Sequence, residues 1–143
     1  WKHEGGTDLN LVIIDGQGGG LGRQLVSAVK DRYPDIEIIA VGANSAATNA
    51  MLRAGATQAA TGENSVIVAC RRADVIIGPV GIVIADSMLG EITPAMAQAV
   101  GQSRAKRILI PVNLCDNIIV GVTDLSMTKN VQNAVEILGT LID

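Results

Sequence analysis

The stretch Leu9-Asn-Leu-Val-Ile-Ile-Asp15-Gly-Gln-Gly-Gly-Gly-Leu-Gly22-Arg23 decides the expected fold of this chain. Aliphatic residues fill Leu9 to Ile14 apart from one asparagine, and such a short apolar run predicts a buried β-strand. Five of the next eight residues are glycines. Residues 21–33 then place apolar side chains at helical spacing, up to Pro34, which cannot continue a helix. A strand, a glycine-rich turn and a helix in this order predict the start of a βαβ unit.

The rest of the chain continues this alternation of short apolar runs and amphipathic stretches. Residues 64–72 have the composition of a strand, but a strand there would leave no crossover before the clear strand at 75–77, so we expect a helix. Residues 78–90 form an apolar connection without a clear period, and residues 118–122 fit either a short sixth strand or part of a loop. Further strands are expected at residues 36–41, 57–61 and 107–112, and further helices at residues 44–53, 93–103 and 128–141.

These elements predict a single α/β domain from residue 9 to residue 143. Right-handed crossovers give a mostly parallel sheet of five or six strands between two layers of helices, a three-layer Rossmann-like or flavodoxin-like fold. The expected strand order is 3-2-1-4-5, and in such sheets ligands bind beyond the carboxyl ends of the strands, where the order reverses. Four loops meet at that edge: residues 15–23, 42–45, 78–81 and 113–117.

The composition narrows the classes of function. The chain has 11 basic and 14 acidic residues and a net charge of −3. This balance argues against nucleic acid as the main partner, because duplex binding usually needs a basic face. No apolar run is long enough to cross a membrane. Residues 1–8, which include the only histidine, His3, are expected to be a flexible tail or a vector-derived remnant.

The two cysteines lack the spacing of a metal cluster or of a disulfide framework. We therefore expect no metal site, two free thiols and a cytoplasmic location. Cys70 precedes two arginines on an expected helix and is predicted to pack in the core. Cys115 has no basic partner nearby in the sequence and is predicted to be an inert thiol.

The glycine loop, residues 16–22, is the strongest functional signal. Glycine lets the backbone approach a ligand closely, and free N–H groups at the start of a helix suit a phosphate group. We therefore expect a phosphate-bearing small ligand at this edge of the sheet, a nucleotide or a dinucleotide. The candidate binding residues are Asp15, Gly16, Gln17, Gly18, Gly19, Gly20, Leu21, Gly22, Arg23, Gly42, Asn44, Ser45, Gly78, Pro79, Gly81 and Asn113.

The pattern G-x-x-x-G-[IL]-G at Gly16, Gly20, Leu21 and Gly22 resembles the cofactor loop of short-chain dehydrogenases/reductases. This resemblance covers the first third of the chain and implies NADP or NAD as cofactor. Those enzymes also use a Tyr-x-x-x-Lys pair, whereas Tyr33 is followed here by Pro-Asp-Ile-Glu, so their reductase chemistry is not carried over. No carboxylate follows the second strand to hold a ribose diol, which favours the phosphorylated dinucleotide.

A longer similarity runs from Val12 to Val122. The segments Ile14–Gly22, Ala60–Asn64, Gly78–Ser87, Gly90–Ala97 and Ile110–Asn113 read IDGQGGGLG, ATGEN, GPVGIVIADS, GEITPAMA and IPVN. In these motifs the chain looks like a small bacterial family known only as a conserved domain of unknown function. The resemblance implies no activity, but it implies that these segments belong to one site.

A weaker similarity links the chain to methylglyoxal synthase, a lyase of comparable length and architecture. Ala40–Ser45 lies where that enzyme has its phosphate loop, Ile110–Asn113 resembles its I-P-V-A-T-N loop, and Glu63 after Gly62 is nearest to its catalytic aspartate. The second aspartate and the histidine of that enzyme have no counterpart here. The resemblance therefore implies phosphate binding more strongly than elimination chemistry.

Asp15 and Glu63 are the candidate acid/base residues. Asp15 could orient a ribose hydroxyl or a metal-bound phosphate, or it could hold N–H groups of the loop. Glu63 could act as a general base, but a carboxylate at a helix start fits a cap better. Asp86 and Glu91, five residues apart, do not share a helix face and are not expected to form an acid/base pair.

Three classes of function follow from these features. The first is a module that binds a nucleotide without turnover. The second is a lyase acting on a phosphorylated metabolite through Asp15 or Glu63. The third is a scaffold that uses the apolar segment of residues 79–89 for assembly and leaves the glycine loop empty. For the protein as a whole we expect a homo-oligomer, with part of the surface of residues 79–89 in its interface.

Overall fold

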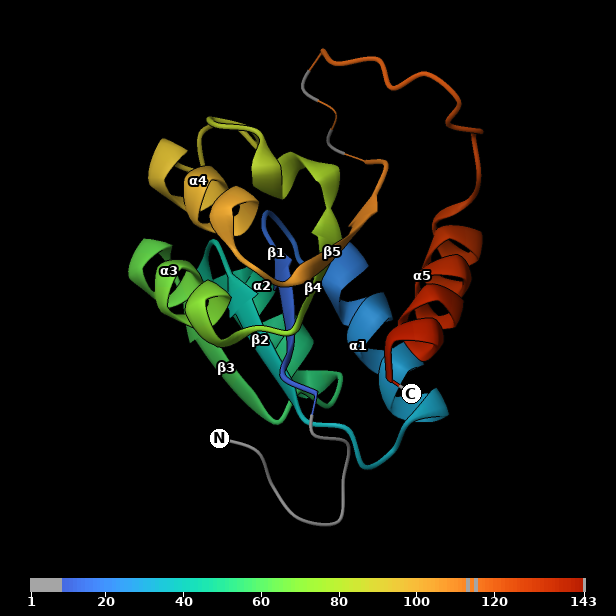
Figure 1. The fold of residues 1–143 in the computed structure, drawn as a ribbon. Helices are drawn as coiled ribbons and strands as arrows, with labels where there is room; N and C mark the ends of the chain where they lie inside the picture. Colours follow the sequence, from blue (N-terminus) through green and yellow to red (C-terminus); the bar gives the residue numbers. More distant parts are fainter. Residues whose placement is uncertain (1–8, 113, 115, 143) are drawn as a thin grey trace.

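The computed structural model of the chain describes residues 9–112, 114 and 116–142 (Figure 1). Strands and helices alternate in the order β1 (Leu11–Asp15), α1 (Gly20–Arg32), β2 (Ile38–Gly42), α2 (Ser45–Arg53), β3 (Gln58–Thr61), α3 (Glu63–Arg72), β4 (Val75–Pro79), a short 3₁₀ helix η1 (Val80–Val83), α4 (Pro94–Gln102), β5 (Lys106–Ile110) and α5 (Met127–Ile142). The helix predicted at residues 64–72 is confirmed as α3.

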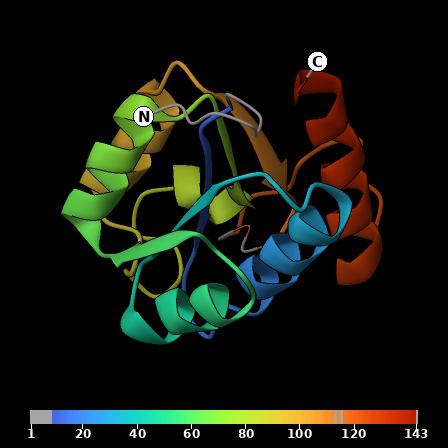
Figure 2. The ribbon, with the colours of Figure 1, turned by 90° about the horizontal axis from the view of Figure 1, so that it is seen from below.

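The strands form one parallel sheet in the order β3-β2-β1-β4-β5, as predicted. Helix α1 packs against α2 and α5 on one face, and α3 packs against α4 on the other (Figure 2). The order reverses between β1 and β4, because the chain leaves β1 for one face of the sheet and leaves β4 for the other. These two strand ends therefore open the edge where ligands bind in folds of this class.

Strand β1 is buried along its whole length because helices cover both of its faces. Leu11 and Ile13 belong to the core on the side of α1 and α5, whereas Val12 and Ile14 belong to the core on the side of α3 and α4. This alternation follows from the two-residue period of a strand. It explains why the strand reads as a continuous apolar run in the sequence.

Two helix starts follow the capping rules. The Asn44 side chain accepts a hydrogen bond of 2.9 Å from the N–H group of Ala47 at the start of α2. The Thr93 hydroxyl accepts one of 3.2 Å from the N–H group of Met96, and proline occupies the first position of α4. These caps satisfy N–H groups that lack a partner within the helix.

The apolar segment of residues 79–89 is divided between core and surface. Ile82 and Met88 belong to the core under α3 and α4, whereas Leu89 is exposed, so only part of the segment is accessible to a partner. Several exposed apolar side chains lie in the long β5–α5 loop, the excursion between Ile110 and Met127, which extends away from the rest of the domain (Figure 1). Residues 118–122 lie in this excursion as a loop and form no strand. None of the helices in the described ranges has the length and apolarity needed to span a membrane.

Candidate functional site

The glycine loop joins the end of β1 to the start of α1 and is closed by Asp15. One carboxylate oxygen of Asp15 accepts a hydrogen bond of 2.8 Å from the N–H group of Gly16, and the other accepts one of 2.7 Å from Gly22. Burial raises the pKa of this carboxyl group above its ordinary value, the two backbone N–H donors oppose the rise, and the nearby Glu91 charge adds to it. Of the two roles left open for Asp15, the structure shows the contact with loop N–H groups.

Packing explains two of the loop glycines directly. A Cβ atom at Gly16 would lie 2.7 Å from the Oε1 atom of Glu91, and a Cβ atom at Gly22 would lie 2.9 Å from the Cβ atom of Asp15. The Asp15 Cβ atom cannot move away, so packing requires glycine at Gly22, whereas at Gly16 the flexible end of the Glu91 side chain would have to shift. The candidate glycines that end the neighbouring strands are explained in the same way: a Cβ atom at Gly42 would meet Thr48, and one at Gly78 would meet backbone of β1.

The three central glycines of the loop differ from one another. Gly19 has a φ of 73° and a Cβ atom there would lie 2.7 Å from the Cα atom of Ala47, so glycine is required. At Gly18 and Gly20 a Cβ atom would meet no atom within 4 Å, and neither residue has a positive φ. These two positions are therefore open toward the outside of the loop, and neither folding nor packing requires glycine there.

The start of α1 presents free hydrogen-bond donors at the same place. Among the described residues, no protein acceptor takes the N–H groups of Gly18, Gly20 and Leu21. The first N–H groups of a helix have no partner within the helix, and the helix dipole places partial positive charge beside them. A phosphate group or another anion could bind these donors.

Glu91 contacts the glycine loop directly, although it was not among the candidate binding residues. Its Oε1 atom accepts a hydrogen bond of 2.7 Å from the N–H group of Gln17. The Asn44 side-chain amide lies 3.1 Å and 3.0 Å from its two carboxylate oxygens and also donates to the Gln17 carbonyl at 2.9 Å. Glu91 therefore ties the glycine loop to the end of β2. The motif Gly90–Ala97 contained this residue, but nothing in its spacing assigned it to the loop.

The connecting segment, residues 84–93, has an unusual backbone conformation. It places Glu91 at the edge of the sheet formed by the carboxyl ends of the strands. Asp86, Met88 and Leu89 have φ values of 66°, 56° and 56°, and Gln17 opposite them has a φ of 49°. Residues other than glycine adopt this left-handed region uncommonly, and such residues cluster at functional sites. The hydrogen bonds of Glu91 connect the two regions that contain these residues.

The remaining polar candidates are either engaged in other contacts or exposed at the first turns of helices. The Asn44 side chain already caps α2 and bonds to Glu91, so a ligand would have to share or replace those bonds. Ser45 and Arg23 are exposed in the first turns of α2 and α1. Glu63 begins α3, but its carboxylate accepts a hydrogen bond from the Thr93 hydroxyl, so it links α3 to α4 rather than capping its own helix.

The end of β4 lies beside the glycine loop, as predicted. Ile77 pairs with Ile13, which brings the following residues of β4 next to the end of β1. Gly78, Pro79 and Gly81 are buried, and the Gly81 carbonyl accepts a hydrogen bond from the buried Ser87 hydroxyl. Asn113, the last candidate in the sequence, lies outside the described residues, as do Cys115 and residues 1–8.

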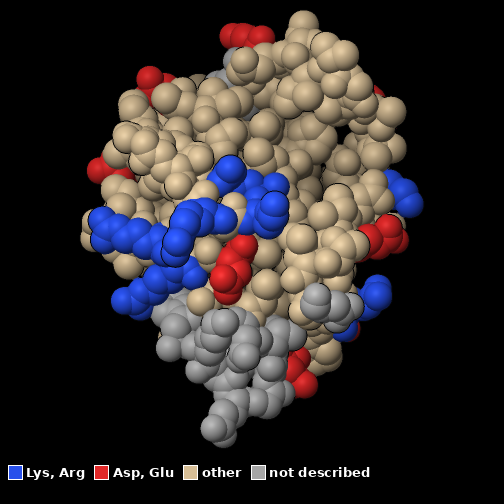
Figure 3. Space-filling model, viewed as in Figure 1, with Lys and Arg blue, Asp and Glu red and all other residues tan. Residues whose placement is uncertain are grey.

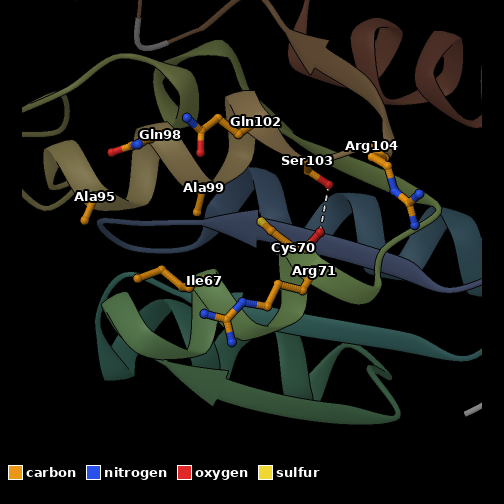
Figure 4. Close-up of a pocket in the computed structure, with 9 residues that line it drawn as sticks. All are labelled: Ile67, Cys70, Arg71, Ala95, Gln98, Ala99, Gln102, Ser103 and Arg104. Atoms are coloured by element: carbon orange, nitrogen blue, oxygen red, sulfur yellow. Dashed lines mark hydrogen bonds between the residues drawn. The ribbon is translucent and has the colours of Figure 1, made fainter.

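Away from the glycine loop, a hollow of about 460 Å³ lies between α3 and α4 and runs along the length of α4 (Figure 4). Cys70 faces it and is buried, as predicted, and burial raises the pKa of its thiol to about 11. The Ser103 hydroxyl donates to the Cys70 carbonyl at 2.7 Å, and Gln98 and Gln102 line the opposite side. None of the candidate binding residues lines this hollow.

Basic side chains gather over the end of α3 and the start of β5 (Figure 3). Arg107 donates to the carbonyl groups of Val100, Ser103 and Ala105, with the shortest of these bonds 2.7 Å long. Cations at this place offset the negative ends of the helix dipoles. We therefore assign Arg107 to the structure of the α4–β5 turn rather than to a ligand site.

Comparison with known proteins finds a family model, described as Domain of unknown function (DUF3842), that matches residues 10–143. No curated protein matches the chain. Among solved structures, the chain is similar to a dodecameric FMN-dependent Ubix-like decarboxylase from Escherichia coli O157:H7. The identity is 18% and the TM-score is 0.46, over 90% of this chain and 76% of that chain.

Proposed function

The chain belongs to the DUF3842 family, as its motifs predicted, and from the geometry of the site we propose that it binds a phosphate-bearing small molecule. The ligand is a nucleotide or a dinucleotide of the NAD(P) type, with a phosphate group at the start of α1. The glycine loop, Asn44 and the end of β4 surround this place. The proposed function is binding, and the proposal assigns no reaction.

One observation carries this proposal. Gly18 and Gly20 leave open space where a side chain would stand, although neither packing nor φ requires glycine there. Beside them, the N–H groups of Gly18, Gly20 and Leu21 have no acceptor among the described residues. Close access to backbone and free donors at a helix start are what a phosphate group needs.

The two acid/base candidates do not favour a lyase. Both carboxylate oxygens of Asp15 accept hydrogen bonds from the loop, and the carboxylate of Glu63 accepts one from Thr93. These contacts account for both oxygens of Asp15 and for one oxygen of Glu63 without a role in proton transfer. The binding function is therefore the better-supported proposal.

Calorimetric titration of pyrophosphate, ATP, FMN, NADH and NADPH into the purified protein tests this function. The Gly20→Val variant would place a branched side chain over the free donors, so we expect it to weaken binding at least about tenfold. Gly101→Val is the matched control, because Gly101 lies near the end of α4 and a Cβ atom there also meets nothing within 4 Å.

Binding by the wild type that Gly20→Val weakens and Gly101→Val preserves would support the proposal. A well-folded wild type that binds none of the five compounds at millimolar concentration would overturn it. Equal losses in both variants would also overturn it, because they would show that the glycine loop is not the binding place. Circular dichroism spectra and melting curves of both variants establish that each is folded.

A further inference from the structure

Glu91 lies where a dinucleotide-binding fold needs a group that recognises ribose. Strand β2 ends at Gly42, and the residues that follow it, Ala43 and Asn44, supply no carboxylate. Glu91 enters this place from the connecting segment and lies 3.0 Å from the Asn44 amide. In sheets of this order, the carboxylate beyond β2 accepts hydrogen bonds from the ribose hydroxyls. The position is therefore filled by a residue about fifty places later in the chain than β2.

From this placement we propose that Glu91 determines specificity for a ribose with a free 2′-hydroxyl and excludes a 2′-phosphate. This inference rests on the proposed function, since it needs a nucleotide whose phosphate lies at the start of α1. It reverses the expectation drawn from the sequence, which favoured the phosphorylated dinucleotide because no carboxylate follows β2 directly.

The hydrogen bonds of Glu91 leave room for one more donor. Its Oε1 atom accepts from the Gln17 N–H group and the Asn44 amide, whereas its Oε2 atom accepts from the Asn44 amide alone. A carboxylate oxygen can accept two hydrogen bonds. The Oε2 atom therefore keeps an acceptor position that a ribose hydroxyl can occupy, and the side chain is only half-buried.

The negative charge of Glu91 also favours a free 2′-hydroxyl over a 2′-phosphate. Among the described residues, no lysine or arginine forms an ion pair with this carboxylate. Its partners are a backbone N–H group and a neutral amide, which orient the charge without neutralising it. A 2′-phosphate at this place would face an uncompensated negative charge in a partly desolvated site, and such like-charge contacts are strongly unfavourable.

The test compares NADH with NADPH in the same titration, because the two differ only in the 2′-phosphate. We expect the wild type to bind NADH at least about tenfold more tightly than NADPH. Glu91→Gln keeps the size and an acceptor oxygen but removes the charge, and we expect it to bring the two affinities within about threefold of each other. The ratio of affinities is the readout, because a general loosening of the loop would weaken both ligands together.

Asp86→Asn is the matched control. Asp86 lies in the same connecting segment, is exposed and loses the same charge, and asparagine tolerates its φ of 66°. We expect this variant to keep the wild-type ratio. An equal change of ratio in Asp86→Asn and Glu91→Gln would overturn the inference, because net charge rather than contact with Glu91 would then decide specificity.

The failure of this inference differs from the failure of the proposed function. If pyrophosphate, NADH and NADPH all fail to bind the folded wild type, the proposed function is wrong and the inference falls with it. If pyrophosphate binds and the two dinucleotides bind equally or not at all, phosphate binding stands and the role of Glu91 is wrong. Tighter binding of NADPH than of NADH by the wild type would also overturn the role of Glu91.

Discussion

The carboxylate of Asp15 holds the N–H group of Gly22 at 2.7 Å, across the whole width of the glycine loop. Its other oxygen holds the N–H group of the adjacent residue, so one side chain fixes both ends of the turn. The side chain is only 4% exposed. The loop is therefore closed from the inside by a buried charge, and its outer surface is left to Gly18 and Gly20.

This arrangement predicts that Asp15 makes stability depend on pH. Its folded-state pKa is raised, mainly by burial, above the value of an exposed aspartate. The folded protein therefore binds more protons than the unfolded chain between the two pKa values, and the free energy of unfolding falls as pH rises through this window. We expect urea denaturation to show the wild type gaining stability relative to Asp15→Asn as the pH is lowered from 7 toward 4.

The Asp15→Asn variant supplies the reference for that comparison. Asparagine can accept only one of the two N–H groups and faces the other with its own donor, so we expect a loss on the order of 1–3 kcal/mol. A stability difference that stays flat with pH would show that the hydrogen bonds of Asp15 balance its burial, and wild-type stability that grows relative to the variant as pH rises would show that they outweigh it; either result would contradict the prediction.

A pair of glycine substitutions separates the structural positions of the loop from the open ones. Gly22→Ala would bring a methyl group 2.6 Å from the Sδ atom of Met51 and 2.9 Å from the Cβ atom of Asp15, and we expect a loss of about 1–3 kcal/mol. Gly20→Ala meets nothing within 4 Å, so we expect no loss and a gain of up to about 1 kcal/mol. Chemical denaturation measures both. Similar losses at the two positions would contradict the distinction drawn between them.

The sequence predicted what depends on neighbouring residues along the chain. The apolar run before Asp15, the glycine turn and the helical spacing after it are local signals, and they placed β1, the loop and α1 correctly. The same signals could not tell Gly22 from Gly20, because the atoms that exclude a side chain at Gly22 come from tertiary packing. Residues 118–122 have strand-like composition, but no strand in the described part of the chain pairs with them.

The contact of Glu91 with the glycine loop could not be predicted from local sequence signals either. Glu91 is 74 residues from Gln17 in the sequence, and the segment that carries it has neither helical nor strand periodicity. Its position depends on left-handed backbone at Asp86, Met88 and Leu89, and of these only Asp86 is a residue type that favours such a turn. Only the folded chain brings this carboxylate to the end of β2.

The thiol of Cys70 is predicted to be unreactive in the folded protein. Burial raises the pKa of its thiol to about 11, so only about one molecule in a thousand carries the reactive thiolate at pH 8. In a Cys115→Ser background, we expect a disulfide reagent such as DTNB to label the native protein at least about 100-fold more slowly than the protein unfolded in urea. The rate should rise with pH up to about 11. Rapid labelling of the native protein at pH 8 would show that this thiol is accessible and ionised.

The excursion between β5 and α5 is predicted to mediate self-association. Ile118 and Val120 are 92% and 96% exposed, and covering such a side chain contributes about 1.5–3 kcal/mol. We therefore expect light scattering at micromolar concentration to show an oligomer for the wild type and a monomer for the Ile118→Ser, Val120→Ser double variant. The melting temperature of the dilute protein should not change, because these side chains contribute little to the core.

Leu89→Ser is the control, since Leu89 is 99% exposed in the segment where the sequence suggested an interface. A wild type that is monomeric at this concentration would contradict the prediction, and so would a double variant that keeps the wild-type mass. Loss of assembly in Leu89→Ser alone would show that the interface lies in residues 79–89.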